Sequence, residues 1–219
     1  MTTSVCVRPA SPDAIDQERP LSGQDLRDLA FSLRLWQSLG TSFAIATVVS
    51  AQGAALRRTG SVMAVSQSGQ TIGFNPAGSL DGAIRELAAE VLATGQDRVE
   101  CLEVDAEAAS YIGLSGQVSL QVHITGMQAA DAEFGNVLRQ LDSGRAGVVI
   151  IGTDRASGYA VVGPASTAGS LGWPELPWPV VEDARALLGT RQAAWRTYGP
   201  GGERGGTGTV VWMQSYPQS

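Results

Sequence analysis

Two short segments of this chain combine residue types that bind anions. Residues 53–60 form a predicted turn with Arg57 next to Arg58, and residues 73–78 form a glycine-containing loop before a predicted helix. A guanidinium group donates paired hydrogen bonds to phosphate or carboxylate oxygens. The N-terminus of a helix adds free N–H groups and partial positive charge. Together the two segments indicate a site for a small anionic ligand, although glycine loops before helices are also common without a ligand.

The predicted helix after the loop begins at Ser79, which we expect to be its N-cap, and runs to about Thr94, with Gly95 ending it. Asp81 falls in its first turn, where a carboxylate stabilises the helix but repels an anion placed too close. We therefore expect Asp81 to face a different part of the ligand. The pocket itself is predicted between the Arg57-Arg58 turn and this helix N-terminus.

The composition excludes several kinds of chemistry. All fifteen basic residues are Arg, so no lysine can form a Schiff base or complete a phosphate-binding P-loop. His123 is the only histidine, and its place in an alternating run, residues 118–124, predicts a solvated strand residue rather than a catalytic one. Cys6 and Cys101 are the only cysteines and indicate neither a disulfide framework nor a thiolate metal site. No metal site is predicted.

The charge of the chain limits its partners and location. A formal net charge of −6 and a pI near 4.8, with no basic stripe, argue against nucleic acid and anionic membranes as partners. No apolar run is long enough to span a bilayer, and the first twenty residues lack an apolar signal region. The predicted location is the cytoplasm. Homodimer formation is left open.

The order of predicted elements indicates an α/β protein that contains an internal repeat. A helix is predicted over residues 21–39 and strands over 43–49 and 61–65, with an alternating strand around His123 and a helix over 130–141. From Gly147 the pattern repeats, because a buried strand at 148–151 and Thr167-Ala168-Gly169 match the earlier strand and Thr71-Ile72-Gly73. The predicted domains are a flexible tail at 1–20, a first half at 21–146 and a related second half at 147–219.

The two halves differ in their loops. The second half has no counterpart of the Arg57-Arg58 turn, and its loop at 172–179 is rich in Trp and Pro, which suits either a pocket wall or simple packing. The sequence contains no GxGxxG before a helix, so it predicts no dinucleotide site and no Rossmann domain.

The motifs of the first half resemble those of the xanthine dehydrogenase accessory protein family, XdhC/CoxI. That family has G-S-x-P-R-x-x-G-A-x-M, a strand, and then G-x-x-x-G-G-C-L/V-E at the start of a helix. Here residues 53–63 keep Gly53, Arg57, Gly60 and Met63, and residues 73–81 keep Gly73, Gly78 and Leu80. Ser79 stands where the family has cysteine and Asp81 where it has glutamate. A third motif, G-L-x-C-G-G, is reduced to residues 113–117 without cysteine.

The resemblance implies the N-terminal α/β region of that family, without its Rossmann domain. It implies a maturation factor or chaperone that binds the molybdenum cofactor (molybdopterin) for a molybdenum hydroxylase, and a separate Rossmann-domain chain as a second partner. The residues implied to hold the ligand are Arg57, Arg58, Gly60, Gly73, Asn75, Gly78, Ser79 and Asp81.

A second hypothesis follows from the missing cysteines. A serine hydroxyl is a poor molybdenum ligand and a poor sulfur carrier, whereas the arginines and the helix N-terminus still suit a pterin phosphate. The pocket of an XdhC-like ancestor is then repurposed for another small anionic substrate of a biosynthetic pathway, with Asp81 as acid or base and Arg57 or Arg58 as the anion clamp. Whether the protein is an enzyme is left open by the sequence.

Overall fold

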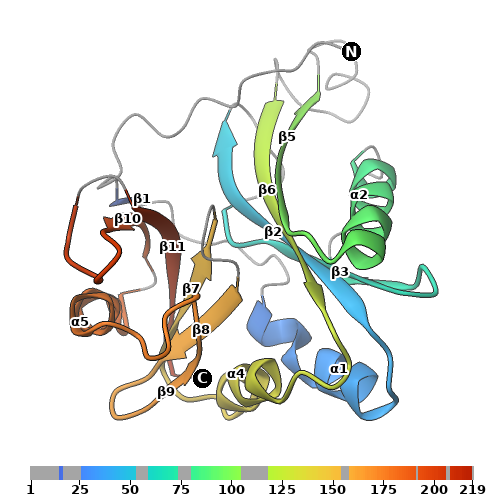
Figure 1. The fold of residues 1–219 in the computed structure, drawn as a ribbon. Coiled ribbons are helices and arrows are strands. Elements are labelled where there is room, and N and C mark those ends of the chain that lie inside the picture. The colour runs from blue at the N-terminus through green and yellow to red at the C-terminus, as the bar shows by residue number, and fades with distance from the viewer. Residues whose placement is uncertain are drawn as a thin grey trace. The chain divides into compact units, whose positions relative to one another are not determined.

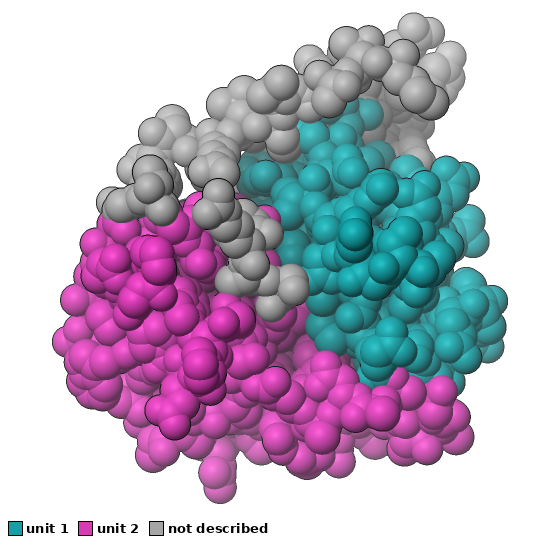
Figure 2. All heavy atoms as spheres, in the orientation of Figure 1, with its two compact units in different colours: residues 1–8, 20–25, 41–128 teal, residues 9–19, 26–40, 129–219 magenta. Residues whose placement is uncertain are grey.

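The computed structural model describes residues 15–16, 26–52, 59–73, 80–104, 118–153, 158–190, 192–205 and 208–218. Contacts within the chain separate two compact units, shown in different colours in Figure 2. Unit 1 contains residues 41–128, and unit 2 contains residues 26–40 and 129–219, each with part of the first 25 residues. The two units are defined by contacts within the chain. The predicted tail at 1–20 and the predicted halves at 21–146 and 147–219 were defined from the sequence and its repeat, and these boundaries stay a prediction.

In the part of unit 1 that the structure describes, helix α2 covers a five-stranded antiparallel sheet (Figure 1). The strand order across the sheet is β4-β3-β2-β6-β5. The elements in chain order are β2 (Phe43–Gln52), β3 (Val62–Ser66), β4 (Thr71–Gly73), α2 (Asp81–Thr94), β5 (Arg98–Val104) and β6 (Val118–Met127). The strand β5 was not predicted from the sequence.

Helix α2 forms because its apolar residues recur at helical spacing. Ile84, Ala88 and Val91 are fully buried and pack against alternate side chains of β2, β3 and β6. Gly95 ends the helix in the left-handed conformation, with φ of 69°, as predicted. The N-cap position is Leu80 rather than Ser79, so the predicted start of the helix was early by about one residue.

Unit 2 is built on a six-stranded sheet in the order β1-β10-β11-β7-β8-β9, in which every neighbouring pair is antiparallel. Its elements in chain order are β1 (Ile15–Asp16), α1 (Leu26–Ser38), α4 (Ala132–Asp142), β7 (Gly147–Gly152), β8 (Gly158–Val162), β9 (Thr167–Gly169), α5 (Trp178–Leu187), β10 (Ala193–Tyr198) and β11 (Thr209–Tyr216).

The sheet of unit 2 has a helix on each face. Val180, Ala184 and Leu187 of α5 join the core cluster that contains Ile150 and Val162. Alternation along β8 turns Tyr159 to the other face, where its ring meets Phe134 of α4 edge to face at 5.5 Å between centroids. Helix α1 packs in turn against α4 (Figure 1).

Strand pairing confirms that the fold is an α/β repeat. The run α1, β2, β3, β4, α2, β5, β6 has the same order and the same strand pairing as α4, β7, β8, β9, α5, β10, β11. Registers align the copies residue by residue: Gly73 is opposite Met63 as Gly169 is opposite Ala160. Both glycines have positive φ, 83° and 85°. All pairings among the described strands are antiparallel, so these residues form no Rossmann-type parallel sheet.

No helix in the described part of the chain is both long and apolar enough to cross a bilayer.

Candidate functional site

Two of the three connections that carry the family-like motifs leave the sheet of unit 1 at the same end. Ser119, near the start of β6, is opposite both Gln52 at the end of β2 and Glu103 near the end of β5, so 53–58 and 105–117 begin on either side of the start of β6 (Figure 1). The third connection, 74–79, begins after Gly73, which is opposite Met63 near the start of β3 and thereby level with Ala46 of β2. We call the end at which β6 begins, together with the start of β3 and the end of β4, the motif end.

Gly60 and Gly73 shape the described edge of the motif end. The N–H of Gly60 donates to the carbonyl of Val48 at 2.7 Å, and its φ of 91° lets the chain turn into β3. Beside it the register of β2 shifts between Val48 and Ser50, as in a β-bulge. Gly73, at φ of 83°, ends β4. The two predicted glycines therefore lie on neighbouring strands, where the backbone requires left-handed conformations.

Helix α2 points its N-terminus toward the motif end. Its late residue Val91 lies against Gly126, which pairs with Ala44 at the opposite end of the sheet. The helix has 14 residues and is about 20 Å long, so Asp81 in its first turn lies well away from the end of the sheet that contains Ala44.

Among the described residues, no side chain caps the N-terminus of α2. Leu80 occupies its N-cap position without a side-chain hydrogen bond, as Pro177 does in α5, whereas in α4 the carboxylate of Asp131 accepts from the N–H of Phe134 at 2.9 Å. The first N–H groups of a helix have no partner within it and need a side chain, water or ligand. An anionic group is well suited to this position, because it both accepts these hydrogen bonds and meets the positive end of the helix dipole.

Three of the predicted site residues are thus described: Gly60 beside Val48 of β2, Gly73 at the end of β4, and Asp81 in the first turn of α2. The others lie outside the described residues: Arg57, Arg58, Asn75, Gly78 and Ser79.

Gln121 is a residue of this region that the sequence analysis did not select. It lies near the start of β6, opposite Ser50 and Cys101, and its side-chain oxygen is buried with no hydrogen-bond partner. A buried acceptor without a partner is costly unless water or a ligand satisfies it. Gln121 could not be selected from the sequence, because a polar residue in an alternating strand is common on solvent-exposed faces.

His123 is buried, and the prediction of a solvated strand residue was wrong. Its relative exposure is 1%, and burial lowers its pKa from 6.5 to about 4, so the ring is neutral at pH 7. The hydroxyl of Thr125 lies 3.3 Å from its Nδ1 and donates to Asp97 at 3.1 Å. Alternation correctly put His123 on the face opposite Val122 and Ile124, but that face is buried too, as Phe43 and Ile45 show.

At the corresponding end of unit 2, polar side chains pair with one another beside an open pocket of about 270 Å³. Tyr198, at the end of β10, donates to Asp183 at 2.7 Å, and Arg204 donates to Asp183 at 2.9 Å and to Glu182 at 2.5 Å. Burial raises the pKa of Asp183, but the hydrogen bonds from Arg204 and Tyr198 outweigh it and leave that pKa below its usual value. Burial and the bond to Asp183 raise the pKa of Tyr198. This network was not predicted, because it joins residues that only the fold brings together.

The described residues hold no group of three or more His, Cys, Asp or Glu that could bind a metal ion. Cys101 is disulfide-bonded, which the sequence analysis did not predict, and its partner lies outside the described residues. Thiolate ligation from Cys101 is therefore blocked in this state.

Comparisons with known proteins match part of this chain to a known family and its fold to a solved structure. The model of the XdhC and CoxI family matches residues 36–105, which run from the end of α1 through β5. No curated protein gives a significant match. A crystal structure described as a xanthine dehydrogenase from Bacillus halodurans is similar, with a TM-score of 0.52 and 16% identity over 69% of this chain and 46% of that one. The chain thus spans less than half of that protein, and at this identity the likeness shows the fold. Residues 36–105 of this chain are therefore an XdhC/CoxI-like region.

Proposed function

We propose that this chain is an XdhC-like accessory protein that holds the molybdenum cofactor by its pterin phosphate at the motif end of unit 1 and serves the maturation of a molybdenum hydroxylase. The observation that carries the proposal is the N-terminus of α2, which follows the motif connection 74–79, on a sheet whose other two motif connections leave one end together. Two of these connections, 53–58 and 74–79, lie inside the segment that the family model matches.

The donors around this end suit the phosphate of such a cofactor. Among the described residues no side chain caps the first turn of α2, and its N–H groups can donate to a dianionic phosphate. Arg57 and Arg58 lie outside the described residues, and in this proposal their guanidinium groups donate to the same phosphate. These groups bind and orient a polar, phosphorylated ligand.

The soft ligands that would bind a metal are missing from the same place. Ser79 stands where the resemblance implies cysteine, and residues 113–117 lack cysteine as well. A serine hydroxyl stays protonated near neutral pH and neither ligates molybdenum nor carries sulfur well. When bound, the cofactor itself would supply the molybdenum chemistry, and this chain would hold its phosphate end.

The proposal is tested by binding of molybdenum cofactor released from a molybdenum hydroxylase. The full chain is mixed with it anaerobically, and bound pterin is measured by fluorescence after oxidation and gel filtration, with molybdenum measured in the same fractions. We expect one pterin per chain, and at least 10-fold weaker binding in Arg57→Ala/Arg58→Ala, because a charge-assisted hydrogen bond contributes about 1.5–3 kcal/mol. The matched control is Arg98→Ala, which removes an exposed arginine paired with Glu90 on the same unit.

Elemental analysis separates the pterin from a protein-ligated metal. Wild type purified without cofactor should hold no stoichiometric molybdenum, zinc or iron, and molybdenum should enter only together with pterin. Metal in wild type that survives Arg57→Ala would contradict the proposal. Metal gained only in Ser79→Cys would mark position 79 as the place where thiolate ligation was lost.

A further inference from the structure

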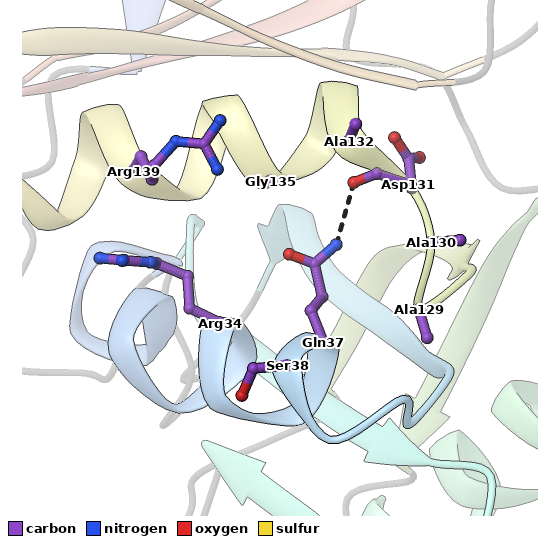
Figure 3. Close-up of a pocket in the computed structure, with 9 residues that line it drawn as sticks. All are labelled: Arg34, Gln37, Ser38, Ala129, Ala130, Asp131, Ala132, Gly135 and Arg139. Carbon is purple, nitrogen blue, oxygen red and sulfur yellow. Dashed lines mark hydrogen bonds between the residues drawn. The ribbon is translucent and has the colours of Figure 1, made fainter.

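An open pocket of about 330 Å³ lies between α1 and α4, within unit 2. Figure 3 shows Gln37 of α1 reaching toward Asp131 at the start of α4, with Arg34 also on α1 and with Gly135 and Arg139 on α4. The amide nitrogen of Gln37 donates to the carbonyl of Asp131 at 3.1 Å, which ties the two helices together at one side of the pocket. A volume of this size is at the lower end of small-molecule sites.

Two arginines line this pocket in a chain whose net charge is negative. Arg34 pairs with Asp142, which does not line the pocket. Arg139 donates to the neutral amide of Asn136, and among the described residues it has no carboxylate partner. The carboxylate of Asp131 is already used as the N-cap of α4. The pocket therefore offers the guanidinium of Arg139, which no carboxylate of the described residues neutralises, and that of Arg34, which also pairs with Asp142.

Small residues leave room beside these arginines. Ala129, Ala130, Ala132 and Gly135 form much of the wall. A Cβ on Gly135 would lie 3.4 Å from Oε1 of Gln37 and 3.6 Å from Nη1 of Arg139, so the absence of a side chain there keeps the Arg139 guanidinium accessible.

We propose that this pocket is a second binding site, for a small molecule that carries a carboxylate or a phosphate. The guanidinium of Arg139 takes the oxyanion, Arg34 adds positive charge from the facing helix, and the alanine and glycine wall accepts the remainder of the molecule. None of these residues belongs to the motif end, so this inference stands or falls independently of the proposed function.

Titration of the full ¹⁵N-labelled chain tests the site, with sodium phosphate and sodium acetate as separate probes at constant ionic strength. Chemical shifts of the Gly135 amide and the Arg139 side-chain N–H are followed. We expect saturable shifts at both positions, and an affinity at least 10-fold lower in Arg139→Gln, the size expected from losing a charge-assisted hydrogen bond. Arg98→Gln, an exposed arginine of unit 1, is the matched control and should bind like wild type.

Each outcome decides between the sources of the oxyanion or rejects the site. Saturation with phosphate alone assigns a phosphorylated ligand, and saturation with acetate alone assigns a carboxylate ligand. Saturation with each of the two probes assigns a site that binds either oxyanion. Arg139→Lys, which keeps the charge but not the fork, should bind more weakly than wild type. Linear shifts without saturation, or equal affinity in wild type, Arg139→Gln and Arg34→Gln, would overturn the proposal.

Discussion

The two copies of the repeat share strand pairing but exchange polar and apolar residues at matching positions. Registers align His123 of β6 with Trp212 of β11, and both are about 1% exposed. They also align Leu102 of β5 with Tyr198 of β10. Leu102 packs on the core of unit 1, whereas Tyr198 bonds to Asp183. The same strand pairing thus accommodates the buried imidazole of His123 in one copy and the hydrogen-bonded carboxylate of Asp183 in the other.

The ends of the two sheets show where the copies differ in use. Among the described residues, no side chain caps the N-terminus of α2 in the first copy or of α5 in the second. In the second copy, however, Arg204 pairs with Glu182 and Asp183 on α5. The second copy thus pairs a guanidinium with carboxylates of its own helix, whereas we propose that the arginines of the first copy bind a ligand.

The largest expected effect comes from a substitution at a glycine with positive φ that both copies have at the same position, Gly73 in the first and Gly169 in the second. At Gly169 a Cβ would lie 2.1 Å from the carbonyl of Tyr159 and 2.8 Å from Val137, in addition to the strain of φ at 85°. Gly169→Ala should lower the free energy of unfolding by about 4 kcal/mol, a size reserved for clashes in the core. Gly69, at φ of 82° with open space around it, is the matched control, and Gly69→Ala should cost only about 1 kcal/mol. Equal losses in urea unfolding would contradict the steric account.

Acid should weaken unit 1 through His123. Its pKa is about 4 when folded and 6.5 when unfolded, so the unfolded state binds the proton first as pH falls. Stability from the neutral ring is complete above pH 6.5 and is lost from there toward pH 4, by about 3 kcal/mol in total. In His123→Phe this part of the pH dependence should vanish. Unfolding at pH 7, 5.5 and 4 checks it, and a variant that keeps the full slope would show that another group titrates.

Tyr198→Phe should separate the polar contact of unit 2 from its packing. The lost hydroxyl donates to the carboxylate of Asp183, so we expect about 1–2 kcal/mol of destabilisation at pH 7. Tyr216→Phe removes a hydroxyl bonded to the neutral amide of Gln214 at 3.2 Å, and should cost less. The pKa of Asp183 is held low in the folded state, so its contribution is present at neutral pH and fades as pH falls through that pKa. An equal cost for both tyrosine variants would contradict the role of the charge.

The smallest expected effect concerns the helices that begin each copy. Helix α1 contains no glycine, whereas α4 has Gly135 in its interior. A methyl group there would make ordinary contact with Gln37, so Gly135→Ala should raise the free energy of unfolding by about 0.5–1 kcal/mol. A thermal unfolding scan measures this change in stability. Destabilisation by Gly135→Ala would mean that α1 and α4 pack too closely to accommodate a methyl group.

Periodicity and glycine spacing were enough to predict the repeat, α2 and α4. They failed where burial depends on partners distant in sequence. Alternation gives the face of His123 but not what covers that face, and the charged run of β5 concealed a strand that is completed by pairing with β6. The start of α2 was misplaced because Ser79 suits a cap that Leu80 occupies. The Asp183, Tyr198 and Arg204 network needs the hairpin after β10 to fold against α5.

The central claim, that ligand binding belongs to the first copy, is tested most directly by hydrogen exchange of the full chain with and without molybdenum cofactor. We predict that cofactor slows exchange of the amides in the first turn of α2, residues 81–84, and leaves the first turn of α5, residues 178–181, unchanged. Slowing confined to α5, or no slowing in α2 at saturating cofactor, would contradict the claim.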